Sequence, residues 1–110
     1  MEMLTKQEEL FLLAIFRIGE KAYLVNIREH LIEHAGKDWA FGSVYTSLEK
    51  LVKKGLIKTS VGEPSTTRGG KAIKFYALTS KGVDALLDTK KLHDTMWREF
   101  GNFAIEKGLK

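Results

Sequence analysis

The sequence predicts an α+β fold that is mostly α, and three observations point to it. Three segments with helically spaced apolar residues come first, two short β-branched and aromatic runs follow, and one long amphipathic segment ends the chain. A length of 110 residues with 44% apolar residues suits one compact core rather than several. We therefore expect three helices, a two-stranded β hairpin and a long C-terminal helix.

Helical spacing of apolar residues predicts the first three helices over about 5–18, 22–35 and 41–54. Thr5 and Glu8 form a capping-box pattern at the start of the first helix. A glycine directly follows the predicted end of each helix, where a left-handed residue commonly ends the helical backbone. Each of the three helices therefore has a stop signal as well as an apolar face.

The pattern then changes to that of strands. Segments 56–61 and 72–78 are predicted strands, and 62–70 is rich in Gly, Ser and Thr, which predicts a long loop between them. Thr79 can cap a final helix over about 80–107. A lone amphipathic helix of this length needs a partner surface to be stable, so we expect it to pack on another element or subunit.

Positive charge is concentrated in one stretch of the chain. Eight of the 18 basic residues but only one of the 14 acidic residues lie between Lys50 and Lys81, so this stretch carries +7 and the rest −3. Such a distribution is typical of a surface that binds a polyanion. The order helix, helix, helix, strand, basic loop, strand is that of a winged helix-turn-helix, so the sequence predicts binding to double-stranded DNA.

The predicted third helix and hairpin supply candidate DNA contacts. Short polar side chains near a helix N-terminus suit base-edge contacts, lysines further along neutralise phosphates, and glycines beside an arginine suit close approach to a minor groove. The predicted DNA-binding residues are Ser43, Tyr45, Thr46, Lys50, Lys53, Arg68, Gly69, Gly70, Lys71 and Lys74. We also expect Ser47 and Lys54 to face outward from the third helix.

Four stretches of the chain share their residues with a known family. They are Ala22 and Tyr23 with Ile27; 39–45 with Leu48, Leu51 and 55–57; 68–71 with 74–76; and Leu78 and Thr79 with Gly82. In these stretches the chain resembles the PadR-like transcriptional regulators, in their short form with a single C-terminal dimerisation helix. The resemblance implies a repressor that forms a homodimer through this helix, assisted by the first helix, and that binds a pseudo-palindromic operator. The corresponding domains are 1–79 for DNA binding and 80–110 for dimerisation.

Aromatic side chains are concentrated on the predicted last helix. Met96, Trp97, Phe100 and Phe103 lie within one short segment. Aromatic stripes at helical spacing most often pack in an interface, which predicts contacts between subunits. The alternative is a pore between subunits in which a small aromatic effector stacks on the tryptophan.

No pattern in the sequence predicts an enzyme, a cofactor or a metal site. His30 and His34 flank a glutamate as in inverted zinc peptidases, but the chain has only one other His and is far too small for such an enzyme. We therefore expect this pair to be polar surface residues. No nucleophile–base set stands out, and the absence of Cys excludes a thiolate site.

Two further expectations concern partners and location. The alternative function is a winged-helix module that binds proteins without contacting DNA, against which the lysines of the third helix argue. The longest apolar run, from Leu10 to Phe16, is far shorter than the roughly 20 residues of a membrane span, and no signal peptide is visible. We expect a cytoplasmic protein with no membrane contact.

Overall fold

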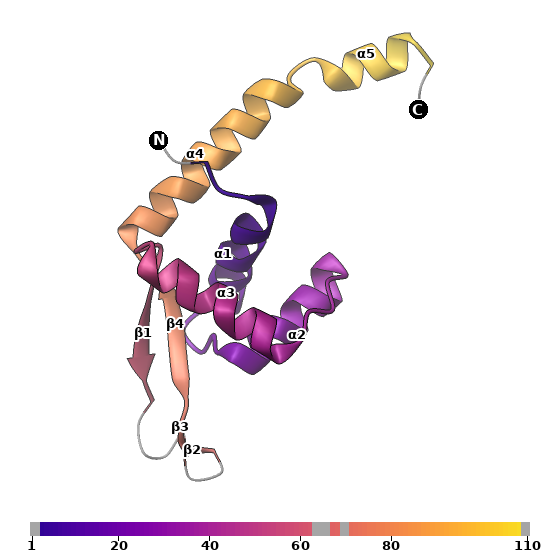
Figure 1. Cartoon of the computed structure of the whole chain (residues 1–110). Helices are drawn as coiled ribbons and strands as arrows, with labels where there is room; N and C mark the ends of the chain where they lie inside the picture. Colours follow the sequence, from indigo (N-terminus) through magenta and orange to yellow (C-terminus); the bar gives the residue numbers. More distant parts are fainter. Residues whose placement is uncertain (1–2, 63–66, 69–70, 109–110) are drawn as a thin grey trace.

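The computed structural model describes residues 3–62, 67–68 and 71–108. The helices are α1 (Lys6–Ile18), α2 (Leu24–Ala35), α3 (Phe41–Lys53), α4 (Ser80–Trp97) and α5 (Phe100–Glu106). The strands are β1 (Ile57–Val61), β2 (Thr67–Arg68), β3 (Lys71–Ala72) and β4 (Lys74–Leu78). Three helices and the hairpin form the body of the molecule, and α4 leads away from it to α5 (Figure 1). This arrangement confirms the predicted winged helix-turn-helix with a long C-terminal helical segment.

Local hydrogen bonds set the helix ends. The Thr5 hydroxyl accepts a bond from the Glu8 N–H at 3.1 Å, and the Glu8 carboxylate accepts one from the Thr5 N–H at 2.9 Å, which confirms the capping box. α2 begins two residues later than predicted, because the Asn26 side chain accepts the Tyr23 N–H at 2.8 Å and holds that residue outside the helix. Gly55 has the predicted left-handed backbone, with a φ of 77°.

One hydrophobic core lies between the first three helices and the hairpin. Its largest fully buried side chains are Phe11, Leu12, Ile15, Ile27, Val44, Leu48, Leu51 and Ile57. Burial of each such side chain contributes about 1.5–3 kcal/mol relative to exposure. Because the whole apolar stripe of α3 is buried here, its opposite face is left to solvent.

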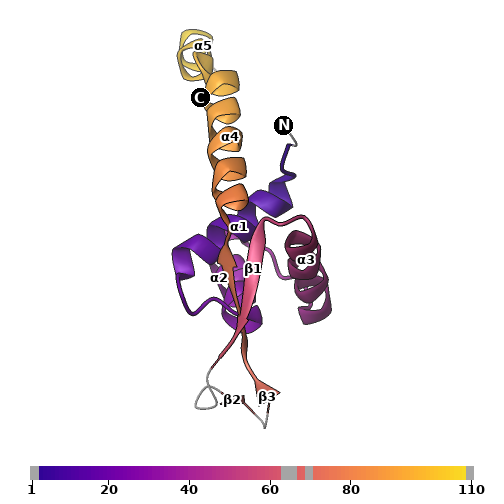
Figure 2. The same cartoon turned by 90° about the vertical axis from the view of Figure 1, so that its left-hand side faces the viewer.

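The hairpin projects from the end of the body opposite to α4 and α5 (Figure 2). β1 pairs with β4 in antiparallel register, from Ile57 with Leu78 to Val61 with Lys74. The predicted loop and second strand need a correction: β2 and β3 form a separate two-residue pairing, and Ile73 interrupts the second strand. Short polar pairings lack an apolar alternation, so the sequence pattern does not reveal them.

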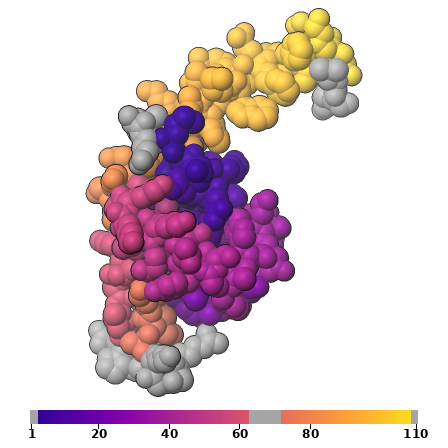
Figure 3. All heavy atoms as spheres, viewed as in Figure 1, coloured from indigo at the N-terminus to yellow at the C-terminus, as the bar shows by residue number. Residues whose placement is uncertain are grey.

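The single helix predicted over 80–107 is in fact two helices. α4 ends at Trp97, Arg98 adopts extended ψ of 134°, and Glu99 takes a left-handed φ of 70° before α5 begins. Apolar spacing continues across this break, which is why periodicity alone predicted one helix. In Figure 3, α5 stands clear of the body of the molecule. Neither α4 nor any other helix of the described ranges has the length and apolar character needed to cross a bilayer.

Candidate nucleic-acid interface

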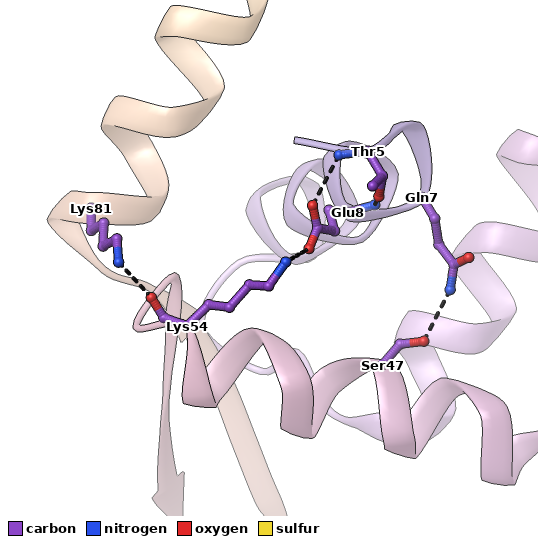
Figure 4. A network of polar contacts seen from close by, with 6 residues as sticks. All are labelled: Thr5, Gln7, Glu8, Ser47, Lys54 and Lys81. Atoms are coloured by element: carbon purple, nitrogen blue, oxygen red, sulfur yellow. Dashed lines mark hydrogen bonds and ion pairs between the residues drawn. The ribbon is translucent and has the colours of Figure 1, made fainter. Parts of the chain in front are cut away.

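One flank of α3 is fixed to α1. The Gln7 side chain donates a hydrogen bond to the Ser47 hydroxyl at 3.0 Å, and the Lys54 ammonium, just beyond the helix, forms an ion pair with Glu8 (Figure 4). Lys54 is thus exposed as predicted and Ser47 is partly exposed, but the side chains of both contact α1. The two residues lie seven positions apart, about two helical turns, and α1 packs along the flank that they share.

Two further hydrogen bonds connect the C-terminal end of α3 to the start of α4. The Lys81 ammonium donates to the carbonyl of Lys54 at 2.8 Å, and the Thr79 hydroxyl donates to the carbonyl of Gly55 at 2.6 Å. Partial burial alone would raise the pKa of Glu8. Hydrogen bonds from Lys54 and Thr5, with the charge of Lys54, outweigh that effect and hold this pKa below its ordinary value. Glu8 is thus a charged partner of Lys54 at neutral pH.

The other flank of α3 is fixed to β4. The carboxylate of Glu49 accepts hydrogen bonds from the Lys74 ammonium at 3.2 Å and from the Tyr76 hydroxyl at 3.3 Å. The same ammonium lies 5.6 Å from the centre of the Tyr45 ring. Burial, followed by the charge and hydrogen bond of Glu49, raises the pKa of Tyr76. Tyr45 and Lys74, both predicted DNA contacts, therefore meet on the side of α3 that faces the hairpin.

Between the two flanks, α3 presents an open face to solvent. Ser43, Thr46, Lys50 and Lys53 are all exposed and lie away from the buried stripe. A helix with its side chains is about 10–12 Å wide, which matches a major groove about 12 Å wide. The structure thus brings these four predicted residues together on a surface of the right width, with short polar groups near the helix start and lysines toward its end.

The far end of the hairpin is described only in part. Arg68 and Lys71 are register partners in the β2–β3 pairing, which places them at the end distant from the core (Figure 1). Gly69 and Gly70 lie outside the described residues. The DNA contacts assigned to these four positions stay predictions.

Sequence reasoning missed two residues that shape this surface. The first is Glu49, which is the only acidic residue in 41–54 and follows Tyr45 by four positions. A single acid among lysines could have indicated that it pairs with one of the basic residues. The second is Arg28 of α2, whose position in the sequence carried no such signal.

Arg28 stabilises the segment that leads into α3. Its Nε donates to the carbonyl of Trp39 at 2.6 Å, its terminal nitrogen contacts the Asp38 carboxylate at 3.1 Å, and its guanidinium lies 4.3 Å from the Phe41 ring centre. Trp39 itself packs against Phe11 with ring centres 5.4 Å apart. These contacts hold the N-terminal end of α3 in place.

The aromatic residues of the C-terminal segment remain largely in solvent. Met96, Trp97, Phe100 and Phe103 are each between 47% and 74% exposed. The ring centres of Trp97 and Phe100 lie 5.3 Å apart, and those of Phe100 and Phe103 lie 6.2 Å apart. The structure thus places the four predicted residues next to one another on an uncovered apolar surface.

The histidine pair behaves as a polar surface feature. The rings of His30 and His34 lie 4.3 Å apart, and the Arg17 Nε donates to His30 Nε2 at 3.0 Å. Burial, then the charges of His34 and Arg17, lower the pKa of His30. Within the described part of the chain, no group of three or more His, Cys, Asp or Glu side chains is arranged to hold a metal ion.

Solved structures share this architecture. RosR of H. salinarum is 25% identical, with a TM-score of 0.68 over 96% of this chain and 94% of that one. A PadR family regulator from Clostridium difficile is 21% identical, with a TM-score of 0.62 over 90% and 95%. Another from Eggerthella lenta is also 21% identical, with a TM-score of 0.66 over 88% and 82%. The latter two similarities show the fold alone.

Sequence comparison supplies the family. No curated protein matches the chain. The model of the PadR-like family of transcriptional regulators matches residues 12–88, which cover the body of the molecule and the start of α4. Members of this family are transcription regulators and not enzymes. The chain belongs to the PadR-like family of transcriptional regulators.

Proposed function

We propose that the protein is a transcriptional repressor that binds a specific double-stranded DNA sequence as a homodimer. PadR-family regulators bind DNA, and the observation that carries the proposal is the open face of α3. Contacts with α1 and β4 fix both flanks of this helix, so it can enter a groove as a rigid element. Such a regulator would act in the cytoplasm, where we expect its DNA target.

The chemistry of the face suits a major groove. Ser43 and Thr46 are short enough to let the helix approach base edges, and Lys50 and Lys53 can reach phosphates. Tyr45 and Lys74 would contact the backbone where the hairpin meets the DNA. The end of the hairpin, with Arg68 and Lys71, would reach adjacent backbone or minor groove.

A second copy of the chain is the partner that fits the exposed aromatic residues. Buried Trp and Phe side chains each remove about 150–250 Å² from water, and monomers rarely expose such large contiguous apolar patches. We propose that α4 and α5, within 80–110, form the dimer interface and that 1–79 bind DNA. The two α3 helices would then reach half-sites about 34–36 Å apart on a pseudo-palindromic operator.

A gel-shift titration in salt tests the proposal. Wild-type protein should bind duplex DNA with an affinity that falls steeply with salt, because each phosphate neutralised adds about 0.9 to the slope of log K against log salt. Replacing both Lys50 and Lys53 by Ala removes four lysines from the dimer, so it should weaken binding to every sequence and reduce the slope by about 3.6. Lys6→Ala, an exposed lysine on α1, is the matched control and should behave as wild type.

Two results would contradict the proposal. One is binding that does not depend on salt, which phosphate contacts cannot produce. The other is specific capture of a partner protein with no affinity for DNA, which would support the alternative of a winged-helix protein-interaction module.

We also propose that a small aromatic effector stacks on Trp97 between the subunits, because Trp97 and Phe100 form an exposed edge-to-face pair. Replacing Trp39 by Phe leaves Trp97 as the only fluorophore of its kind. Planar aromatic compounds should then quench its emission and release bound DNA. Unchanged emission across a diverse compound set would remove this part of the proposal.

A further inference from the structure

An acidic side chain lies at the edge of the surface that we propose contacts DNA. Glu49 follows Tyr45 by one helical turn, and its carboxylate is bound to Lys74 of β4 at 3.2 Å. The two side chains are 34% and 40% exposed, so the ion pair is open to solvent and to any ligand that approaches α3. A carboxylate here repels phosphates and neutralises a lysine that would otherwise attract them.

The carboxylate is held in this place by a buried neighbour. The Tyr76 side chain is only 2% exposed, yet its hydroxyl reaches the same carboxylate oxygen that Lys74 contacts, at 3.3 Å. Tyr76 stays protonated at physiological pH, since its pKa is raised, and it remains a donor to Glu49. A hydrogen bond from a buried side chain thus favours the position of the acid beside Lys74.

We infer that Glu49 is a specificity-determining residue, which lowers affinity for DNA of arbitrary sequence by neutralising Lys74 at the edge of the α3 surface. The inference rests on the proposed function. Non-specific binding depends almost entirely on phosphate neutralisation, so the loss of one available cation weakens it directly. In the operator complex, base-edge contacts fix the register of α3, so Lys74 meets a phosphate only where that register places one. Complexes with other sequences can shift along the DNA and use every available cation.

The variant that isolates this effect is Glu49→Gln. The amide has nearly the size of the acid and can still accept the hydrogen bond from Tyr76, but it carries no charge. The probe is a duplex of about 30 base pairs with randomised sequence, compared with an operator selected from a random pool by the wild-type protein. Equal melting temperatures of variant and wild type check that the fold is retained.

We expect Glu49→Gln to bind the randomised duplex about 3- to 10-fold more tightly at low salt. The salt slope should be steeper by about 1.8, because the dimer gains two available cations. Operator affinity should rise by a smaller factor, so the ratio of operator to random binding falls. Glu33→Gln removes the same charge from an exposed site on α2 and is the matched control. It should leave both the slope and the ratio as in wild type.

A double-variant cycle assigns the effect to the ion pair. Lys74→Ala alone should weaken random-sequence binding, because it leaves the Glu49 carboxylate without its cation near the phosphates. Adding Lys74→Ala to Glu49→Gln should abolish the gain and return the salt slope to the wild-type value.

Two results overturn the inference while the proposed function stands. They are a Glu49→Gln variant that matches the Glu33→Gln control, and a gain that persists after Lys74 is also replaced. Failure of the wild-type protein to bind any DNA would overturn the proposed function and this inference together.

Discussion

Two glycines of the C-terminal segment differ in what surrounds them. A Cβ on Gly82 would lie 2.1 Å from the Leu56 carbonyl oxygen, whereas a Cβ on Gly101 would meet no atom within 4 Å. Gly82 therefore permits the close approach of α4 to the body, which no other residue type would allow without a backbone shift. Gly101 has no such role, although both glycines equally lower helix propensity.

This difference leads to opposite predictions for the same substitution. Gly82→Ala should lower the free energy of unfolding by about 1–3 kcal/mol, because the added methyl group overpacks a backbone contact. Gly101→Ala should leave it unchanged or raise it slightly, because Ala favours a helix. Urea unfolding at one fixed protein concentration measures both. Equal stability of the two variants would contradict the close packing of α4 on Leu56.

The ion pair between Glu8 and Lys54 predicts a pH dependence. The folded-state pKa of Glu8 is lowered, so its charge stabilises the fold above the ordinary pKa near 4.5, and this contribution disappears as pH falls through the lower folded value. Glu8→Gln keeps a residue suited to the capping box. It should lose about 0.5–1 kcal/mol of stability at pH 7 and nothing at pH values below the folded pKa.

Unfolding curves of wild type and Glu8→Gln at several pH values measure this difference. Glu33→Gln, whose carboxylate is mostly exposed and has only a long contact with His34, serves as the control and should show no such loss. A stability difference that stays constant down to low pH would show that the charge of Glu8 is not its source.

At the scale of elements, the break between α4 and α5 depends on an unusual backbone. Among the described residues, Glu99 is the only one other than glycine with a positive φ. A side-chain-bearing residue in that region loses about 1–2 kcal/mol relative to the right-handed conformation. Glycine adopts it without this cost.

Glu99→Gly therefore tests the break through the sign of its effect. With the break present, the variant should be as stable as wild type or about 0.5–1 kcal/mol more stable. In a continuous helix the same change would lower stability by about 1 kcal/mol, as Lys91→Gly in the interior of α4 is expected to do. Urea unfolding with circular dichroism distinguishes the two cases.

α3 shows why a helix with one exposed face needs two neighbours to fix the direction of that face. The buried stripe of α3 determines only which face of the helix points inward. A small rotation of α3 about its own axis would still change the direction of Lys50 and Lys53. Contacts from Gln7 and Glu8 on one flank and from Lys74 and Tyr76 on the other remove this freedom. The direction of the open face thus follows from side chains of α1 and β4 that contact α3.

At the scale of the whole molecule, the hairpin and the exposed aromatic surface lie at different ends. The molecule measures 60 × 28 × 20 Å, with the hairpin at one end and α5 at the other (Figures 1 and 2). The uncovered aromatic residues lie at the α5 end, away from the end that carries the hairpin. Under the proposed function, self-association and DNA binding can therefore take place without competing for one surface.

The proposed dimer predicts a change in molecular mass. Replacing Phe100 and Phe103 together by Ser should shift the protein from dimer to monomer in analytical ultracentrifugation, because the interface loses most of its aromatic surface. Operator affinity should fall as well, since two linked half-sites no longer bind together. Val61→Ser, at an even more exposed apolar position on the hairpin, is the control. A wild-type monomer at micromolar concentration would contradict the proposal.

Much of the architecture could be predicted from the sequence because it depends on local rules. The capping box of Thr5, the inner stripe of α3 and the left-handed Gly55 all arise from residues within a few positions of one another. The gathering of Ser43, Thr46 and the lysines on one exposed face follows from the same helical period.

By itself, the sequence determined the order of the main elements, the buried stripe of α3, the basic stretch 50–81 and the family. The tertiary structure alone decided that Ser47 and Lys54 contact α1, that Glu49 binds Lys74, and that Gly82 lies against the Leu56 carbonyl whereas Gly101 lies in open space. The reason is distance along the chain. Lys54 and Glu8 are 46 positions apart and Lys74 and Glu49 are 25 apart, so only the packing of whole elements brings these partners together.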